Sequence, residues 1–260
     1  MLSREFLTER GYCCGHGCLM CPYEPKHTKG NTKLMEHIKI HDYDKVKFNF
    51  KMFFEERLKF SLENFHDHYE FEYEDDAKHH TDNPIYDKLY SWIRSDEFGE
   101  MWKGFIEECV KPALKSDDIV LQKLPSIKVH PPIYKGNFKD RDNNFHTDGG
   151  KYWHPPFETN FWLPLTTLDR WNTLHVDEGE KIIRPQLMEV GEFMQFDGQS
   201  KVHGTINENK SKTTRVSLDF RGCSLEDYDE EELTEELMTS KKVPVRQKDW
   251  FSIGNYYERF

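Results

Sequence analysis

The second half of the chain consists of short apolar stretches separated by turn-forming residues, and this pattern limits the fold more than any other feature. Each stretch is long enough for one strand and too short for a long amphipathic helix. Many short strands at this spacing are typical of a sandwich or barrel, and a double-sheet jelly roll is one such closure. The predicted strands cover residues 126–130, 144–148, 159–165, 172–176, 181–188, 193–196, 201–206 and 213–221.

Two earlier segments carry different periods. Between residues 84 and 114, apolar side chains recur at helical spacing, which predicts one or two amphipathic helices interrupted near residues 95–99. Between residues 46 and 52, apolar and polar side chains alternate, and this period of two predicts a strand. The apolar positions of that predicted strand are Val46, Phe48, Phe50 and Met52.

Composition permits one sizeable domain and argues against a nucleic-acid partner. The chain has 260 residues, and its 19 Phe, 12 Tyr and 6 Trp supply a core although charged residues make up 32%. Lys and Arg total 36 against 47 Asp and Glu, a net charge of −11. An acidic surface repels phosphate backbones, so an anionic ligand needs its own local cation.

No apolar run approaches the roughly 18–20 residues of a membrane span, and the first residues do not resemble a signal peptide. We therefore expect a cytoplasmic protein without a membrane partner.

His146 and Asp148 stand two residues apart in the run NNFHTDGG. On a strand, residues i and i+2 project from the same face, so both side chains can converge on one metal ion. A third ligand from another strand would complete a set of two histidines and one carboxylate, the arrangement of non-heme Fe(II) oxygenases. Without a third ligand, the pair would be polar residues before a Gly-Gly turn.

His203, in SKVHGTI, is the candidate third ligand. Arg215 follows twelve residues later, and Arg215, Ser217 and Asp219 share one face of the next predicted strand. A buried arginine is costly unless it meets an anion, and a dicarboxylate that also chelates the metal would satisfy it, assisted by the Ser217 hydroxyl. Three other histidines compete for the third position: His130, His154 and His175.

Together these motifs resemble the Fe(II)/2-oxoglutarate-dependent oxygenase superfamily. The runs HPPFETNFWLPLT, NTLHVDEGE, FMQFDG, VHGT and TRVSLDFR are similar to its streptomycin-biosynthesis-type hydroxylase branch, over about residues 120–222. The resemblance implies a double-stranded β-helix, also called a jelly roll or cupin-like fold. It also implies that dioxygen and 2-oxoglutarate are consumed, that succinate and carbon dioxide are released, and that an unactivated C–H bond is hydroxylated.

Carried onto this chain, the resemblance assigns roles to individual residues. His146, Asp148 and His203 would hold Fe(II), and Arg215 with Ser217 would hold the distal carboxylate of 2-oxoglutarate. Asn160 and Trp162 share one face of a predicted strand and are candidates for lining the cosubstrate pocket. The substrate would be a small or amino-acid-like molecule. A catalytically inactive jelly-roll binding protein with a cysteine–metal module is the alternative.

Cys13, Cys14, Cys18 and Cys21 crowd into nine residues, with glycines between them. Such crowding without a secretion signal favours metal or redox chemistry over a disulfide framework. The run resembles a small bacterial cysteine-rich domain of unknown function with a CCGxGCxxCPY signature. A structural metal ion such as zinc is the first interpretation, while a redox-sensitive unligated loop and an iron–sulfur cluster remain open.

These patterns divide the chain into three parts. Residues 1–33 form the cysteine-rich module, residues 34–224 form the jelly-roll domain with its helical segment at about 84–114, and residues 225–260 form an acidic helix and tail.

Overall fold

The computed structural model describes most of the jelly-roll domain and parts of both ends of the chain. The described residues are 4–18, 21, 23, 27–33, 38–69, 84–132, 145–151, 154–155, 157–178, 183–206, 209–228 and 250–260.

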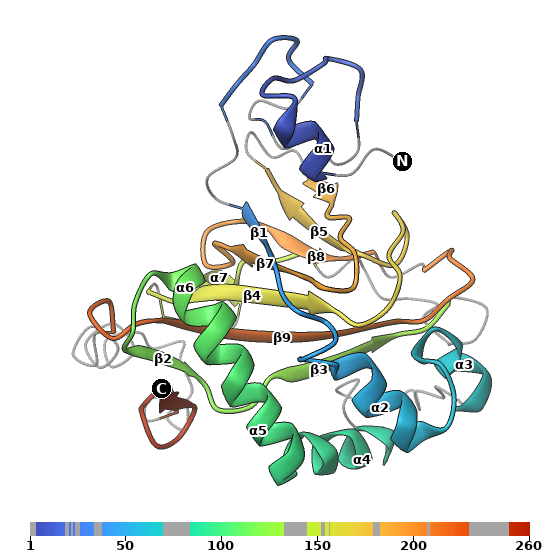
Figure 1. Cartoon of the computed structure of the whole chain (residues 1–260), viewed down its shortest axis with the longest axis vertical. Coiled ribbons are helices and arrows are strands. Elements are labelled where there is room, and N and C mark those ends of the chain that lie inside the picture. Colours follow the sequence, from blue (N-terminus) through green and yellow to red (C-terminus); the bar gives the residue numbers. More distant parts are fainter. Residues whose placement is uncertain are drawn as a thin grey trace.

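Within these residues, the strands form two antiparallel sheets, and the predicted mainly β, jelly-roll class is confirmed (Figure 1). The larger sheet has the order β1-β7-β4-β9-β2-β10, and β3 also pairs with β9. The smaller sheet has the order β6-β5-β8. The strands are β1 (Ile38–Asp42), β2 (Ile119–Gln122), β3 (Ser126–His130), β4 (Thr159–Pro164), β5 (Leu174–Asp177), β6 (Ile183–Pro185), β7 (Glu192–Phe196), β8 (His203–Thr205), β9 (Arg215–Ser224) and β10 (Tyr257–Arg259).

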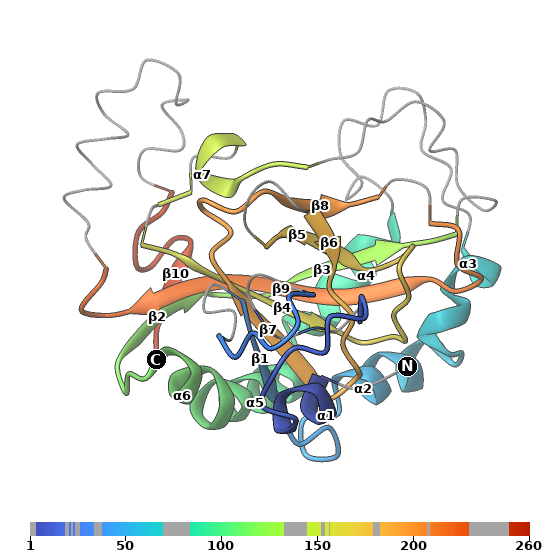
Figure 2. The same cartoon turned by 90° about the horizontal axis from the view of Figure 1, so that it is seen from above.

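Helices cover one face of the larger sheet, and the smaller sheet lies over the opposite face (Figures 1 and 2). The described helical elements are α1 (Arg4–Glu9), α2 (Phe50–Leu58), η1 (Leu62–Asn64), α3 (Phe65–His68), α4 (Pro84–Ile93), α5 (Asp96–Phe105), the π-helical turn η3 (Ile106–Val110), α6 (Lys111–Leu114) and α7 (Asp148–Lys151).

The predicted helical segment is confirmed, and so is its interruption. The side chain of Ser95 accepts a hydrogen bond from the backbone N–H of Phe98 and caps α5, so α4 ends before this residue. Phe98, Trp102 and Phe105 of α5 are buried against the sheet. There the ring centroids of Trp102 and Phe220 lie 4.8 Å apart. Burial of each large apolar side chain contributes about 2 kcal/mol. The helix is therefore fixed to the sheet by its apolar face.

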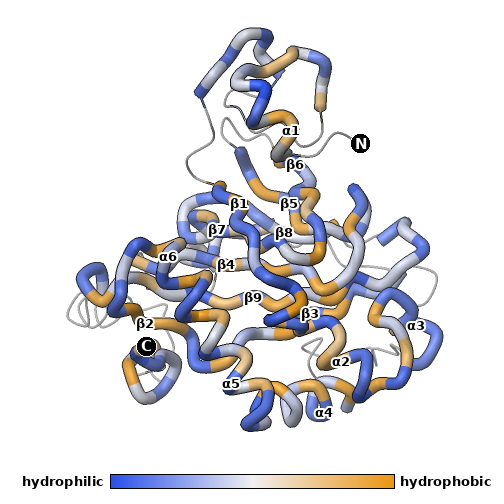
Figure 3. Tube along the Cα trace, in the orientation of Figure 1, coloured by the Kyte–Doolittle hydropathy of each residue, from blue (hydrophilic) through white to orange (hydrophobic). Residues whose placement is uncertain are grey.

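The central strand β9 separates this apolar core from the polar side of the sheet. Val216, Leu218 and Phe220 belong to the main core on the helical side. The alternate positions carry Arg215 and Ser217, which face away from the helices because successive strand residues point to opposite faces. Hydropathy alternates in the same way along the central strands (Figure 3). The face division predicted for this strand is thus found in the structure.

The strand predicted at residues 46–52 is wrong. Asp44 accepts hydrogen bonds from the backbone N–H groups of Val46 and Lys47 and forms a turn there. Asn49 then caps α2, whose buried residues Phe50, Phe53, Phe54 and Leu58 follow helical spacing. The short alternation across residues 46–52 ran across a turn and the first helical residues, and the longer period of the phenylalanines decides the structure.

The two ends of the chain pack differently. The helix α1 lies near the smaller sheet, and its Leu7 packs against Leu187 (Figure 1). At the other end, β10 pairs with β2, and Tyr257 is fully buried. The predicted acidic helix is wrong in its first part, because Ser224 ends β9 and residues 225–227 form a turn. Residues 229–249 lie outside the described residues.

Among the helices that the structure describes, none combines the length and apolar character that crossing a membrane would require.

Replacement of Gly222 by alanine is expected to destabilise the larger sheet. A Cβ atom there would clash with the side chain of Leu121 and the carbonyl oxygen of Val120 on the paired strand β2. Overpacking of this kind costs about 1–3 kcal/mol. The free energy of unfolding, measured by urea titration, should fall by that amount.

Gly99→Ala is the matched control. Nothing lies within 4 Å of a Cβ atom at Gly99, and alanine is favoured over glycine inside a helix by about 1 kcal/mol. If Gly222→Ala were as stable as the wild-type protein, the close packing of β2 on β9 would be refuted.

Candidate metal centre

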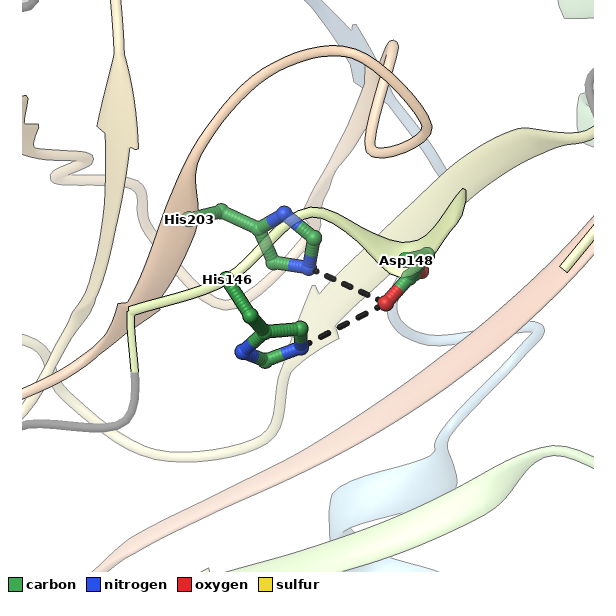
Figure 4. A group of neighbouring side chains, drawn as sticks. All are labelled: His146, Asp148 and His203. Atoms are coloured by element: carbon green, nitrogen blue, oxygen red, sulfur yellow. Dashed lines mark ion pairs between the residues drawn. The ribbon is translucent and has the colours of Figure 1, made fainter. Parts of the chain in front are cut away.

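Three side chains predicted as metal ligands converge in the structure (Figure 4). His146 and His203 form a β-bridge with backbone hydrogen bonds of 2.9 and 2.8 Å. Their Nε2 atoms lie 3.4 and 3.6 Å from Oδ1 of Asp148. One ligand atom from each residue lies within 4.8 Å of the others. The arrangement matches the set of two histidines and one carboxylate that binds one ion on one face.

The local route to this arrangement differs from the predicted one. Residues 144–148 were expected to form one strand, but among the described residues of this stretch only His146 pairs, and Asp148 begins the helical turn α7. The backbone N–H of Asp148 donates to the carbonyl oxygen of Gly198 at 2.9 Å, which fixes the turn against the loop after β7. A helical turn, rather than a shared strand face, therefore brings the carboxylate to the imidazoles.

The two carboxylate oxygens of Asp148 have different surroundings. Oδ2 accepts a hydrogen bond from Nδ2 of Asn160 at 2.6 Å and one from Nε of Arg221 at 2.8 Å. Oδ1 is buried and has no hydrogen-bond partner within the described part of the chain, yet it faces both imidazoles. A buried carboxylate oxygen without a partner is costly, and a cation between it and the imidazoles would remove that cost. The residues present therefore fit a metal ion.

Charge and tautomer also suit metal binding. Although burial alone would raise the pKa of Asp148, the close approach of His146 and the charge of Arg221 hold it well below its ordinary value. Burial lowers the pKa of His203. Nδ1 of His203 lies 3.0 Å from the carbonyl oxygen of Lys201, which can only accept a hydrogen bond. Nδ1 therefore carries the proton, and Nε2 is left as the ligand atom.

Arg215 lies buried beside Trp162 and Ser217. Its guanidinium carbon is 5.8 Å from the centre of the Trp162 ring, and the indole N–H of Trp162 donates to Oγ of Ser217 at 3.1 Å. Among the described residues, Nη1 of Arg215 reaches only Oγ1 of Thr205, at 3.5 Å, and Nε has no hydrogen-bond partner. Burial lowers the pKa of Arg215 to about 10. No described carboxylate forms an ion pair with this guanidinium.

The competing histidines are engaged elsewhere. Nδ1 of His154 pairs with the Glu158 carboxylate at 2.7 Å, and Nδ1 of His175 lies 3.2 Å from the carbonyl oxygen of Thr173. His130 ends β3, opposite Arg215 in the neighbouring strand. None of the three belongs to the metal-binding group found among the described residues.

Asn160 and Trp162 share a strand face as predicted, but their side chains contact different residues. Trp162 lies with Arg215 and Ser217, whereas Asn160 contacts the Asp148 carboxylate. Arg221 was missed by the sequence reasoning. It continues the alternation of Arg215, Ser217 and Asp219 and lies opposite Asn160 in the register of β9 and β4, so extending that alternation by one step would have identified it.

The cysteines of the N-terminal module are not part of this centre. Within the described part of the chain, three or more metal-ligating side chains gather within 4.8 Å only at His146, Asp148 and His203.

Comparison with curated proteins finds a relative in the predicted branch. Over 116 residues the chain is 34% identical to the streptomycin biosynthesis protein StrG of Streptomyces griseus. The matched stretch is 44% of this chain and 51% of StrG, so the chain spans about half the length of that relative. This similarity confirms the resemblance to the streptomycin-biosynthesis-type branch. No family model matches the chain.

Solved structures with a partly similar arrangement include AviO1 from Streptomyces viridochromogenes Tue57, with a TM-score of 0.41 and 13% identity over 73% of this chain and 90% of that one. The non-heme monooxygenase ThoJ has a TM-score of 0.44 and 12% identity over 73% and 75%. A viral collagen prolyl hydroxylase from Paramecium bursaria Chlorella virus-1 has a TM-score of 0.37 and 11% identity over 72% and 90%. At such scores the fold assignment stands on the strand pairing described above.

Replacement of Arg221 by glutamine is expected to weaken metal binding without removing a ligand. The substitution deletes the charge that pairs with Oδ2 of Asp148, leaving Asn160 as the other hydrogen-bond partner of that oxygen. Loss of a group that orients a ligand typically lowers metal affinity about 10–100-fold. Anaerobic calorimetric titration with Fe(II) measures this loss.

Arg259→Gln is the control, because Arg259 forms an exposed ion pair with Asp118 at 3.1 Å. Arg221→Lys should recover part of the affinity, since it restores the charge. An unchanged Fe(II) affinity in Arg221→Gln, with wild-type unfolding behaviour, would contradict the positioning role of Arg221.

Proposed function

We propose that this protein is a non-heme Fe(II)- and 2-oxoglutarate-dependent dioxygenase that hydroxylates an unactivated C–H bond of a small or amino-acid-like molecule. The observation that carries the proposal is the buried group of His146, Asp148 and His203, in which a carboxylate oxygen without a hydrogen-bond partner faces two imidazoles. A set of three protein ligands leaves coordination positions open for other molecules, as non-heme Fe(II) oxygenases require.

The protein residues would hold the iron and keep the site dry. His146, Asp148 and His203 would bind Fe(II), while Asn160 and Arg221 keep the Asp148 carboxylate oriented. When bound, the iron and 2-oxoglutarate supply the oxidising chemistry, with succinate and carbon dioxide as products. Asp148 is fully buried and His203 nearly so, which supports a site from which bulk water is excluded.

Arg215 would bind the distal carboxylate of 2-oxoglutarate. A buried guanidinium without a paired carboxylate is unfavourable, and a carboxylate ligand would provide the missing charge and accept its free N–H groups. Thr205, which contacts Arg215, lies two residues after His203 on β8. Two residues of a strand span about 7 Å, comparable to the length of a five-carbon dicarboxylate. One such molecule would therefore reach from the metal to Arg215.

Ser217 and Trp162 would complete the carboxylate pocket. Since Oγ of Ser217 accepts the indole N–H of Trp162, the hydroxyl hydrogen of Ser217 stays available to donate to a carboxylate. The indole ring also packs beside the Arg215 guanidinium and shields it from water. Trp162 thus acts by positioning Ser217 and Arg215.

Two further observations support the class of substrate and reaction. The net charge of −11 favours a neutral or cationic substrate over an anionic one. The relative StrG is named for the biosynthesis of streptomycin, a small molecule, which agrees with a small-molecule substrate for this chain. Dioxygen would be the second substrate.

Binding of Fe(II) and 2-oxoglutarate tests the proposal directly. When both are added anaerobically to the metal-free protein, we expect the weak visible charge-transfer band of chelated 2-oxoglutarate. His203→Ala should abolish the band because it removes an iron ligand. Arg215→Ala should raise the 2-oxoglutarate concentration needed for half-maximal absorbance by about 10-fold or more, since a charge-assisted hydrogen bond contributes about 1.5–3 kcal/mol.

Arg259→Gln serves again as the exposed control and should behave like the wild-type protein. On admission of air, succinate should form from 2-oxoglutarate in the wild-type protein. Absence of both the band and succinate, in protein that binds Fe(II) at the His146 group, would refute the 2-oxoglutarate dependence and favour a binding protein.

A further inference from the structure

The described residues of the N-terminal module form only a small apolar core. Its described core consists of Cys13, Cys21 and Tyr23, with Cys18 packed against them. One further apolar contact joins Leu7 to Leu187 of the jelly-roll domain. Segments below about 40 residues rarely fold on hydrophobic burial alone and usually need a metal ion, disulfides or oligomerisation. The module therefore needs an additional source of stability.

The four cysteines of the module lie together as two close pairs. The Sγ atoms of Cys13 and Cys21 are 3.5 Å apart, and those of Cys14 and Cys18 are 3.3 Å apart. No three of these sulfurs lie within 4.8 Å of one another, so among the described residues they form two separate pairs.

Backbone contacts hold the cysteines in place. Cys13 is fixed by hydrogen bonds of 2.8 Å from its N–H to the carbonyl oxygen of Asn31 and from the N–H of Gly30 to its own carbonyl oxygen. The N–H of Cys21 donates to the carbonyl oxygen of Cys18 at 3.1 Å, closing a tight turn. Gly15 and Gly17 adopt positive φ angles of 75° and 70°, which lets the loop reverse direction between Cys14 and Cys18.

Burial and neighbouring thiols hinder the ionisation of Cys13 and Cys18. Burial, together with hydrogen bonding to Cys21, raises the pKa of Cys13, and the hydrogen bond with Cys14 followed by burial raises the pKa of Cys18. Cys14 is the exception, because hydrogen bonds from His16 and Cys18 lower its pKa to about 6. A bound cation would favour the thiolate form of all four cysteines.

We propose that Cys13, Cys14, Cys18 and Cys21 bind one thiophilic divalent cation of the zinc type, which stabilises the N-terminal module. In a tetrahedral site with metal–sulfur bonds of about 2.3 Å, neighbouring sulfurs stand about 3.8 Å apart. The observed separations of 3.5 and 3.3 Å are close to that value and far from the ~2.05 Å of a disulfide. One ion would draw the two pairs into a single set, with the loop adjusting at Gly15 and Gly17.

The neighbouring histidines are not needed as ligands. His16 is exposed, and Nε2 of His27 lies 2.9 Å from the carbonyl oxygen of Cys18. Four thiolates satisfy a structural zinc ion completely, without an open position for catalysis. The site is therefore structural, and it is distinct from the centre at His146, Asp148 and His203.

Metal analysis of the full chain, purified under reducing conditions, tests the proposal. We expect one equivalent of zinc per chain that persists in His203→Ala. After exchange with Co(II), the wild-type protein should show thiolate-to-cobalt charge-transfer absorption, which the histidine–carboxylate centre cannot produce because it lacks sulfur. This spectrum does not depend on whether any variant folds.

Cys14→Ser and Cys18→Ser should each lose the zinc and the charge-transfer absorption. Cys109→Ser is the matched control, because Cys109 lies in η3 and is remote in sequence from the module. A zinc-free wild-type protein in which all six cysteines are free thiols and no cobalt–thiolate absorption appears would overturn the proposal. Detection of disulfides between these cysteines in the protein as purified would overturn it as well.

Discussion

The alternation of side chains along β9 is the constraint on which the rest of the structure depends. This ten-residue strand pairs with β4, β3 and β2 and holds the larger sheet together. One face of β9 anchors the helical layer through residues such as Phe220, while the other carries Arg215, Ser217 and Arg221 toward the metal centre. A shift of one residue in register would bury the charges in the apolar core and expose the core residues. Fold and site are thus specified together.

The two buried charges on the polar side of the sheet, those of Asp148 and Arg215, are compensated to different extents. Asp148 receives its compensation from the protein, through Asn160 and Arg221 at one oxygen. Arg215 receives almost none from the described residues, among which its hydrogen-bond partner is the Thr205 hydroxyl at 3.5 Å. An internally paired carboxylate is set up before any metal arrives, whereas an unpaired guanidinium depends on a ligand for its counter-charge. This difference is the physical reason to regard Asp148 as pre-organised and Arg215 as a recognition site for an anion.

Sequence reasoning succeeded where one periodicity persists over a whole element. The helical spacing through α4 and α5 and the alternation along β9 both predicted which face is buried. It failed at residues 46–52, where a short alternation fits a strand although the longer apolar spacing from Phe50 to Leu58 fits a helix. Packing of Phe50 against Phe98 and Phe105 stabilises that helix. It also placed His146 and Asp148 on one strand. In the structure a helical turn, rather than a strand, brings the Asp148 carboxylate to the two histidines. The ligand identities were therefore predictable, while the backbone that delivers Asp148 was not.

The contacts that depend on distant segments lay beyond any local pattern. Tyr257, three residues from the end of the chain, donates its hydroxyl to Glu158, and Glu158 in turn pairs with His154. The backbone N–H of His154 reaches the carbonyl oxygen of Asp148 at 3.4 Å, so this chain of hydrogen bonds connects β10 to the turn that carries the metal ligand. Because β10 is held by β2, which itself pairs with β9, the end of the chain supports the same centre from a second direction. The position of Asp148 is thus a property of the closed sheet, and no segment read alone could have indicated it.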